Sequence, residues 1–148
     1  MKKRSKAFGT ATAGLLAVLA VATPASAVTY TVTDSAAHTG DLCTVNPYYC
    51  NGSASFVKDG DHLLVWDNNS DGHSVVVRYL RSDDGGARHD AWHHYGAGKR
   101  LDINMDLPEG QWPQDYIQYE VCLGEYNNGN NPTIMFETCS GYTIEDTA

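Results

Sequence analysis

The sequence predicts an all-β fold: an antiparallel two-sheet sandwich of about seven or eight short strands, held by two disulfides. Three observations predict it. Apolar and polar residues alternate with the strand period of two, and the alternating runs are bounded by Gly, Asn, Asp and Pro. No window keeps apolar residues at helical spacing for three turns. A closed barrel satisfies the same pattern, so the sequence does not separate the two architectures.

The first 27 residues have the organisation of an export signal. MKKRSK supplies the positive start, an apolar run follows from Ala7, and Ala25-Ser26-Ala27 is the small-x-small pattern of a cleavage site. A membrane anchor is the alternative, but the apolar core is short and is interrupted by Thr and Gly. We therefore predict a cleaved signal peptide at 1–27 and one secreted, extracellular domain at 28–148, with no membrane span after cleavage.

The expected strands are rich in Val, Thr and aromatic residues. The clearest is 101–107, where Leu, Ile and Met alternate with Asp102, Asn104 and Asp106, which gives one buried and one wet face. YIQYEV repeats this alternation, and Trp66 is expected in the core. The remaining strands are expected at 29–33, 53–58, 62–67, 73–80, 133–138 and, as a last short one, within 140–146.

Four cysteines lie in the predicted mature chain: Cys43, Cys50, Cys122 and Cys139. An even number in an exported chain predicts two disulfides, for which three connectivities exist. We favour Cys43–Cys50 and Cys122–Cys139, because each pair brackets one turn-rich segment. A zinc site is the alternative, but it lacks a CxxC knuckle. Strict alternation places Cys122 opposite Val121, so this disulfide is expected on the outer face or at an edge.

The charge excludes some partners. The whole chain has a formal net charge of −8. Lys2, Lys3, Arg4 and Lys6 leave with the signal and no acidic residue does, so the mature charge is −12. An acidic surface repels phosphate backbones and anionic lipid headgroups. We therefore expect no nucleic-acid partner and no membrane-surface role.

Residues 67–72, DNNSDG, fit two interpretations. Asp67, Asn69 and Asp71 occupy the first, third and fifth positions of a calcium loop, and Gly72 the sixth. Arg78 stands at the twelfth position, where a bidentate Glu belongs, and a cation there repels the ion. We predict a hairpin turn without a cofactor, with Ca²⁺ held by additional ligands from elsewhere as the alternative.

The segment RHDAWHHYG carries the most unusual side chains. On a short helix His89 and His93 have the i, i+4 spacing of zinc or copper ligands, whereas on a strand they lie too far apart to chelate one ion by themselves. The plainer interpretation is a polar loop with packed aromatic residues. Exposed Tyr and Trp make efficient contacts with proteins and sugars. We predict a binding surface on loops 43–50, 81–98 and 125–132, with these residues at its centre: Trp92, His93, His94, Tyr95 and Tyr126.

Several motifs resemble those of small, secreted actinobacterial β-sandwich proteins of unknown function. The resemblance rests on the export signal, on VWDNNSDGHSVVVR, on VCLGE and on the closing TCSGY, and it covers about the last 90 residues. It implies a single sandwich domain with a C-terminal disulfide and carries no catalytic residue. Proteinaceous α-amylase inhibitors are a second group for comparison, but their Trp-Arg-Tyr triplet is absent, because Arg78-Tyr79 follows a valine inside an expected strand.

We therefore predict a monomeric, non-catalytic binding domain whose partner is a protein or a cell-envelope glycan. No GxSxG motif is present, and oxidised cysteines are not nucleophiles. An inhibitor of a secreted hydrolase is the alternative, and a metal-binding extracellular protein is a further alternative.

Overall fold

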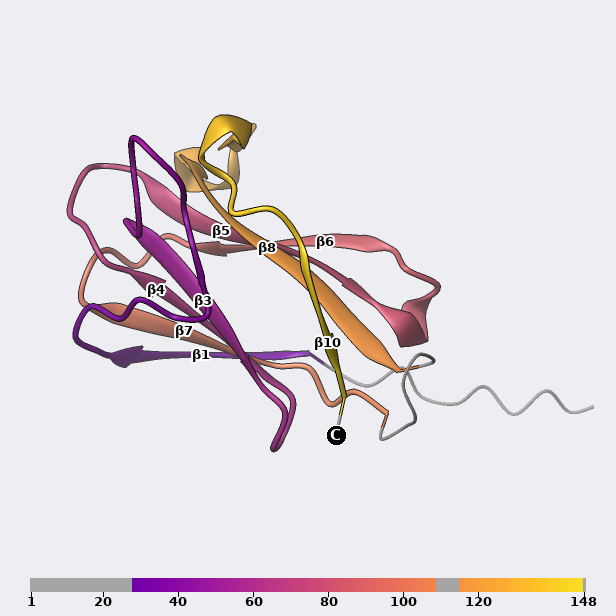
Figure 1. Cartoon of the computed structure of the whole chain (residues 1–148). Coiled ribbons are helices and arrows are strands. Elements are labelled where there is room, and N and C mark those ends of the chain that lie inside the picture. Colours follow the sequence, from indigo (N-terminus) through magenta and orange to yellow (C-terminus); the bar gives the residue numbers. More distant parts are fainter. Residues whose placement is uncertain (1–27, 109–114, 148) are drawn as a thin grey trace, which may run out of the picture.

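The computed structural model describes residues 28–108 and 115–147, so the predicted signal peptide lies outside the described residues. Two antiparallel sheets face each other across one core (Figure 1). The sandwich is thus confirmed. The described residues form ten strands, and two of them were not predicted from the sequence: the two-residue strand Leu42–Cys43 and the six-residue strand Arg88–His93, which was expected as a loop or short helix.

Sheet A has the order β1-β7-β4-β3-β2, with strands at β1 (Thr29–Asp34), β7 (Lys99–Asn104), β4 (His62–Asp67), β3 (Gly52–Val57) and β2 (Leu42–Cys43). Sheet B has the order β10-β8-β5-β6, with β9 also paired to β8, and its strands are β10 (Thr143–Asp146), β8 (Tyr116–Glu125), β5 (Ser74–Arg81), β6 (Arg88–His93) and β9 (Thr133–Met135). Three 3₁₀ turns complete the described fold: η1 (Ser82–Asp84), η2 (Asn127–Gly129) and η3 (Phe136–Thr138).

The core follows the alternation in the sequence. The apolar side chains of 101–107 are all at least 96% buried, and Ile117, Tyr119 and Val121 join them from β8. The Tyr119 hydroxyl accepts a hydrogen bond from the backbone N–H of Phe56 at 3.2 Å, which links the two sheets across the core. Trp66 corrects an expectation: it is buried but lies outside this core cluster, where His38 stacks on it with 4.4 Å between ring centroids.

The DNNSDG segment is a crossover and not the predicted hairpin turn. It leaves β4 in sheet A and enters β5 in sheet B. Strand β4 is already paired with β3 on one edge and β7 on the other, so sheet A offers no free edge beside it for β5. Residues 94–98 cross back from β6 to β7. Two inter-sheet connections therefore lie at the same end of the sandwich.

Both predicted disulfides are present, Cys43–Cys50 and Cys122–Cys139. Cys122 lies opposite Val76 of β5, and both are absent from the core cluster, so the expected outer position is confirmed. Cys122 is nevertheless fully buried, because the chain from β9 to β10 runs along β8 and covers it. The stretch 133–138 is only partly the expected strand, since it turns into η3 after Met135.

Strand register sorts the loops between the two ends of the molecule. Gly52 pairs with Asp67, Ser74 with Gly124, and Val75 with His93, so the loops attached to these positions share one end. We call it the crossover end. Its loops are 35–41, 44–51, 68–73, 94–98 and 126–132. The loop 82–87, which was expected to join the binding surface, lies at the opposite end of β5 and β6.

Candidate functional site

A pocket of about 220 Å³ opens at the crossover end, between the two inter-sheet connections. It is larger than the ~30 Å³ that a water molecule occupies and smaller than the ~300–1,000 Å³ of pockets for drug-sized ligands. Its walls consist mainly of polar groups: Asp67, Asn69, Ser70, Gly72, His73, Ser74, His94, Gly96 and Ala97.

Short backbone contacts hold the two connections in place. The N–H of Gly98 donates to the carbonyl of Asp67 at 3.3 Å, which ties the second crossover to the end of β4. Gly72 and Gly96 have φ of 89° and 86°, a region that side chains with a Cβ rarely adopt. Asp71 stabilises the first crossover, since it accepts hydrogen bonds from the His73 N–H at 3.0 Å and from Asn51 Nδ2 at 2.7 Å.

Asp67 is the buried acid of the pocket. Asp67 is only 5% exposed, and its Oδ1 accepts a hydrogen bond from the Asn69 N–H at 3.2 Å. Within the described residues, Oδ2 accepts no hydrogen bond and no cation pairs with this carboxylate. Burial raises the pKa of Asp67 to about 6, assisted by the nearby charge of Asp71 and opposed by the Asn69 hydrogen bond.

His73 forms a second polar wall. Its Nδ1 lies 2.6 Å from Glu125 Oε1, and Tyr48 packs edge-on against its ring with 5.5 Å between centroids. These contacts fix the ring between loops that are distant in the sequence. The pocket therefore has carboxylate, amide, hydroxyl and imidazole groups around one small space.

An aromatic cluster adjoins the pocket through His94. The His94 ring stacks on Tyr126 at 3.9 Å with 6° between the planes, and on Tyr95 at 4.3 Å with 29°. Two rings at such distances must occupy opposite faces of the imidazole, so His94 lies between the two tyrosines. Trp92 packs on Tyr126 at 5.9 Å, and Tyr95 remains 45% exposed. Trp92, His94, Tyr95 and Tyr126 are called the aromatic cluster below.

The sequence builds this cluster with a glycine and an asparagine-rich loop. A Cβ at Gly124 would lie 2.4 Å from the Thr133 carbonyl oxygen and 2.8 Å from the Trp92 ring, so only glycine lets the indole lie on β8. The following loop takes positive φ at Asn127, Asn128 and Gly129, residues that tolerate the left-handed region. The N–H of Gly129 donates to the Tyr126 carbonyl at 2.8 Å and closes the loop.

The predicted binding residues are brought together with one exception. Four of the five form the aromatic cluster, whereas His93 is fully buried and cannot belong to a surface. Its Nε2–H donates to the Lys99 carbonyl at 3.0 Å, and burial lowers its pKa. The reason is the strand period: His93 shares the inner face of β6 with Ala91, which lies in the core.

The histidine metal site of the helical interpretation has no geometric basis, because 88–93 is a strand. His89 is paired with Asp84 and stacks on Tyr79, while His93 bonds to Lys99. Among residues 28–108 and 115–147, the single group of three metal-ligand side chains is Glu120, Cys122 and Cys139, and its sulfurs form a disulfide. No such group among these residues includes Asp67 or Asp71.

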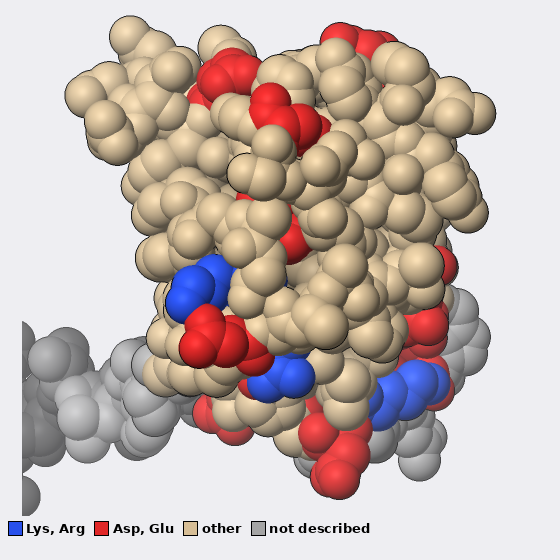
Figure 2. All heavy atoms as spheres, turned by 90° about the vertical axis from the view of Figure 1, so that its left-hand side faces the viewer, with Lys and Arg blue, Asp and Glu red and all other residues tan. Residues whose placement is uncertain are grey.

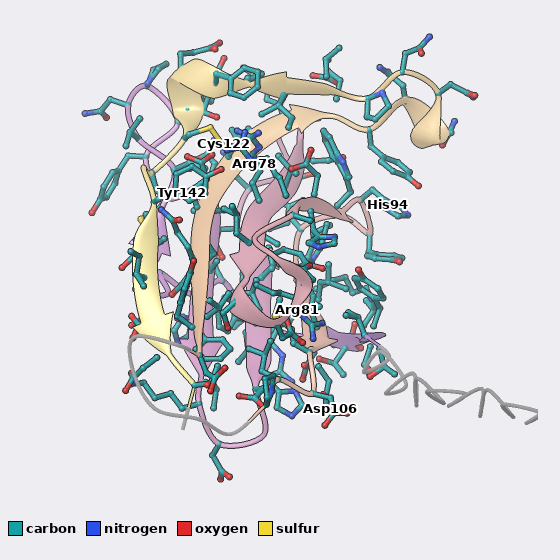
Figure 3. The ribbon with its side chains drawn as sticks, turned by 90° about the vertical axis from the view of Figure 1, so that its right-hand side faces the viewer. Arg78, Arg81, His94, Asp106, Cys122 and Tyr142 are labelled. Carbon is teal, nitrogen blue, oxygen red and sulfur yellow. A yellow bond between two sulfur atoms is a disulfide. The ribbon has the colours of Figure 1, made fainter. Side chains whose placement is uncertain are left out.

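A second charged network, which the sequence did not indicate, lies on the outer face of sheet B. Arg78 pairs with Glu120 at 2.9 Å and with Asp90 at 3.2 Å, and these residues stand directly opposite it on β8 and β6. The Phe136 ring covers the guanidinium at 4.9 Å. Figure 3 shows Arg78, Cys122 and Tyr142 close together under the C-terminal segment. Arg78 is 8% exposed, so it offers no inhibitory side chain to an enzyme.

Charge at the crossover end is predominantly acidic. Figure 2 shows this end. The visible Lys and Arg side chains lie in the lower half of the face, and the charged side chains visible in the upper half are acidic. Among the residues that the structure describes, the lining of the pocket contains no Lys or Arg. The surface therefore favours neutral or cationic ligands over anions.

Comparisons with models of protein families, with curated proteins and with solved structures gave no match to this chain. Within the described residues, no helix has the length and apolar character needed to cross a membrane.

Proposed function

We propose that this protein is a secreted, non-catalytic binding domain that holds a cell-envelope glycan at its crossover end. One observation carries the proposal: the aromatic cluster, assembled from β6, the second crossover and the loop after β8, lies beside a small polar pocket and shares His94 with it. The two disulfides are consistent with an extracellular location.

The chemistry of this site suits sugars. Flat aromatic faces stack on the C–H faces of sugar rings, and Tyr95, whose chain neighbours His94 and Gly96 line the pocket, presents an exposed ring. Sugar hydroxyls both donate and accept hydrogen bonds, and Asp67, Asn69 and Ser70 line the pocket with groups of both kinds. A single ring-sized ligand matches the volume of about 220 Å³.

The alternative partner is a protein. A stable protein interface typically buries ~800 Å² on each side around several large anchors. Within the cluster, Tyr95 is the side chain with a largely exposed ring, and its neighbours His94 and Gly96 line the pocket. One exposed ring next to a small pocket favours a small ring-shaped ligand. A protein partner is therefore treated as the competing outcome of the test.

The test is binding of the purified domain to isolated envelope polysaccharide, measured by sedimentation and repeated after protease treatment of the envelope. Tyr95→Ala is expected to lose about tenfold in affinity, or ~1.4 kcal/mol, because the variant lacks one aromatic stacking face. Tyr49→Ala is the matched control, since Tyr49 is 69% exposed at the same end but outside the cluster. Binding that disappears when envelope proteins are digested would assign a protein partner instead.

A further inference from the structure

Asp67 lacks the partner that a buried carboxylate normally has. The residue is 5% exposed and lines the pocket, and its Oδ2 accepts no hydrogen bond from the described residues. Buried charges in proteins are usually paired or hydrogen-bonded, because removing them from water is costly. An unpaired acid that faces a cavity therefore points to a ligand that supplies the missing positive charge.

The groups around Asp67 reinforce this preference. Asp71 lies close enough to raise the pKa of Asp67, and Glu125 pairs with the pocket-lining His73. His94 comes from the second crossover, and no Lys or Arg lines the space. The pocket is consequently anionic at neutral pH, and a bound cation would meet attraction from several sides.

The aromatic cluster favours a cationic ligand through a second, independent interaction. Ammonium groups are attracted to the faces of Tyr and Trp rings. His94 joins the pocket to the stacked rings of Tyr95 and Tyr126, so a ligand in the pocket extends naturally onto them. The pocket volume also exceeds what a bare metal ion needs, and three metal-ligand side chains do not converge around Asp67 in the described residues.

We propose that the pocket binds the protonated amine of an amino sugar, with Asp67 accepting the ammonium group and the sugar ring lying against the aromatic cluster. This inference rests on the proposed glycan-binding function and specifies its ligand as a sugar with a free amine. An N-acetylated sugar carries no positive charge that could pair with Asp67. The site should therefore bind the acetylated sugar more weakly than the free amine.

The geometry also makes recognition dependent on pH. The ammonium pairs with ionised Asp67, whose pKa of about 6 means that it becomes protonated under mildly acidic conditions. His73 and His94 line the same space, Glu125 pairs with His73, and Asp71 acts on Asp67 by its charge; these groups modulate the field without replacing this pairing. Affinity for the amine is thus expected to fall as the pH drops from 7.5 to 5.

The experiment is calorimetric titration of the mature protein with three probes of equal length: glucosamine oligosaccharide, N-acetylglucosamine oligosaccharide and glucose oligosaccharide. Wild-type protein is expected to bind the amine form about tenfold or more tightly than the other two, the value of one charge-assisted hydrogen bond. Asp67→Asn should remove that preference. Asp106→Asn, the same chemical change at the opposite end (Figure 3), should leave it intact.

Equal affinity for the three probes would overturn the amine assignment while leaving the glycan proposal standing. An amine preference that survives Asp67→Asn would also overturn it. Titration with Ca²⁺ alone is a further arm, because heat that is lost in Asp67→Asn would identify the pocket as a cation site. If Tyr95→Ala leaves envelope binding unchanged, the glycan proposal fails by itself, whatever the amine probes show.

Discussion

Two regions of this molecule bury an acidic side chain to nearly the same degree but surround it with different partners. On the outer face of sheet B, Glu120 is 6% exposed and pairs with Arg78 at 2.9 Å. At the crossover end, Asp67 is 5% exposed and receives only a backbone N–H from its own loop. The first carboxylate has a cation beside it, whereas the second faces a pocket.

This difference distinguishes a buried charge that stabilises the fold from a buried charge that is available to a ligand. A buried acid with its cation contributes to a unique, closed arrangement of strands and of the segment that covers them. A buried acid without one destabilises the fold when ionised, and that cost is offset only when a ligand arrives. Removing one charged group should therefore change the free energy of unfolding in opposite directions in the two regions.

The largest effect is expected from Arg78→Met. Removing the guanidinium leaves Glu120 buried without a cation, which should cost about 3–5 kcal/mol in the free energy of unfolding. Urea denaturation followed by tryptophan fluorescence measures it. The double variant Arg78→Met/Glu120→Leu should recover most of the loss, and Asp90→Asn, which removes the half-exposed partner, should cost under ~1 kcal/mol. A loss below ~1 kcal/mol in the single variant would contradict the structural role.

Removal of the C-terminal disulfide comes next. Replacing Cys122 and Cys139 by Ala should reduce the free energy of unfolding by about 3 kcal/mol, from the loop entropy of a 17-residue separation. Cys43 and Cys50, separated by 7 residues, should contribute roughly 2 kcal/mol when replaced in the same way. Thermal unfolding of the two double variants ranks them. The reverse order would show that the covering segment is held mainly by its backbone contacts to β8.

Asp67→Asn should have the opposite sign. The pKa of Asp67 is raised from its ordinary value near 3.8 to about 6, so the folded state holds the proton more tightly than the unfolded state. The stabilising contribution of protonated Asp67 to folding is therefore complete below pH 3.8 and is lost as the pH rises through about 6. The neutral amide removes that loss, which predicts a gain in the free energy of unfolding of about 3 kcal/mol at pH 8 and almost none at pH 3.5.

The measurement is denaturant unfolding of wild-type and Asp67→Asn protein between pH 3.5 and 8. The difference between the two proteins cancels the other titrating groups, including His93. A variant that is less stable at pH 8 would show that the carboxylate has a structural partner and would remove the physical basis of the ligand site.

The smallest effect on stability is expected from Tyr95→Ala. Its ring is 45% exposed and contacts other rings of the cluster without entering the core, so the change should be within ~0.5 kcal/mol. Chemical denaturation at pH 7 checks this value beside the affinity measurement described above. A large loss of stability together with a loss of binding would mean that the tyrosine organises the loops and does not contact the glycan.

Much of the fold was predictable, because it depends on local alternation. The 101–107 strand, the phase of Cys122 and both disulfides follow from spacing that any sandwich must respect. The four aromatic residues of the cluster were also predictable as contact residues by type and by their position in or beside loops. Their mutual stacking was not, since Tyr126 follows β8, whereas the other three belong to β6 and the connection after it.

The remaining features depend on pairing between distant segments. DNNSDG has the composition of a hairpin turn, and only the two neighbours of β4 reveal that it must leave its sheet. His93 has a polar type but an inner-face position, which the strand period of β6 would have shown had that segment been assigned as a strand. Gly124 in VCLGE was the one local signal of close packing, because a glycine inside a strand often marks another group at short distance.

The pairing of consecutive cysteines has a consequence for biogenesis. In a chain that crosses a membrane N-terminus first, Cys43 meets Cys50 before any other thiol has emerged, and Cys122 meets Cys139 after the first pair has closed. Joining each cysteine to the next one delivered thus gives the native connectivity among the three possible ones. An oxidase alone should suffice to mature this domain, without the slow reshuffling that an isomerase accelerates in proteins with crossed bridges.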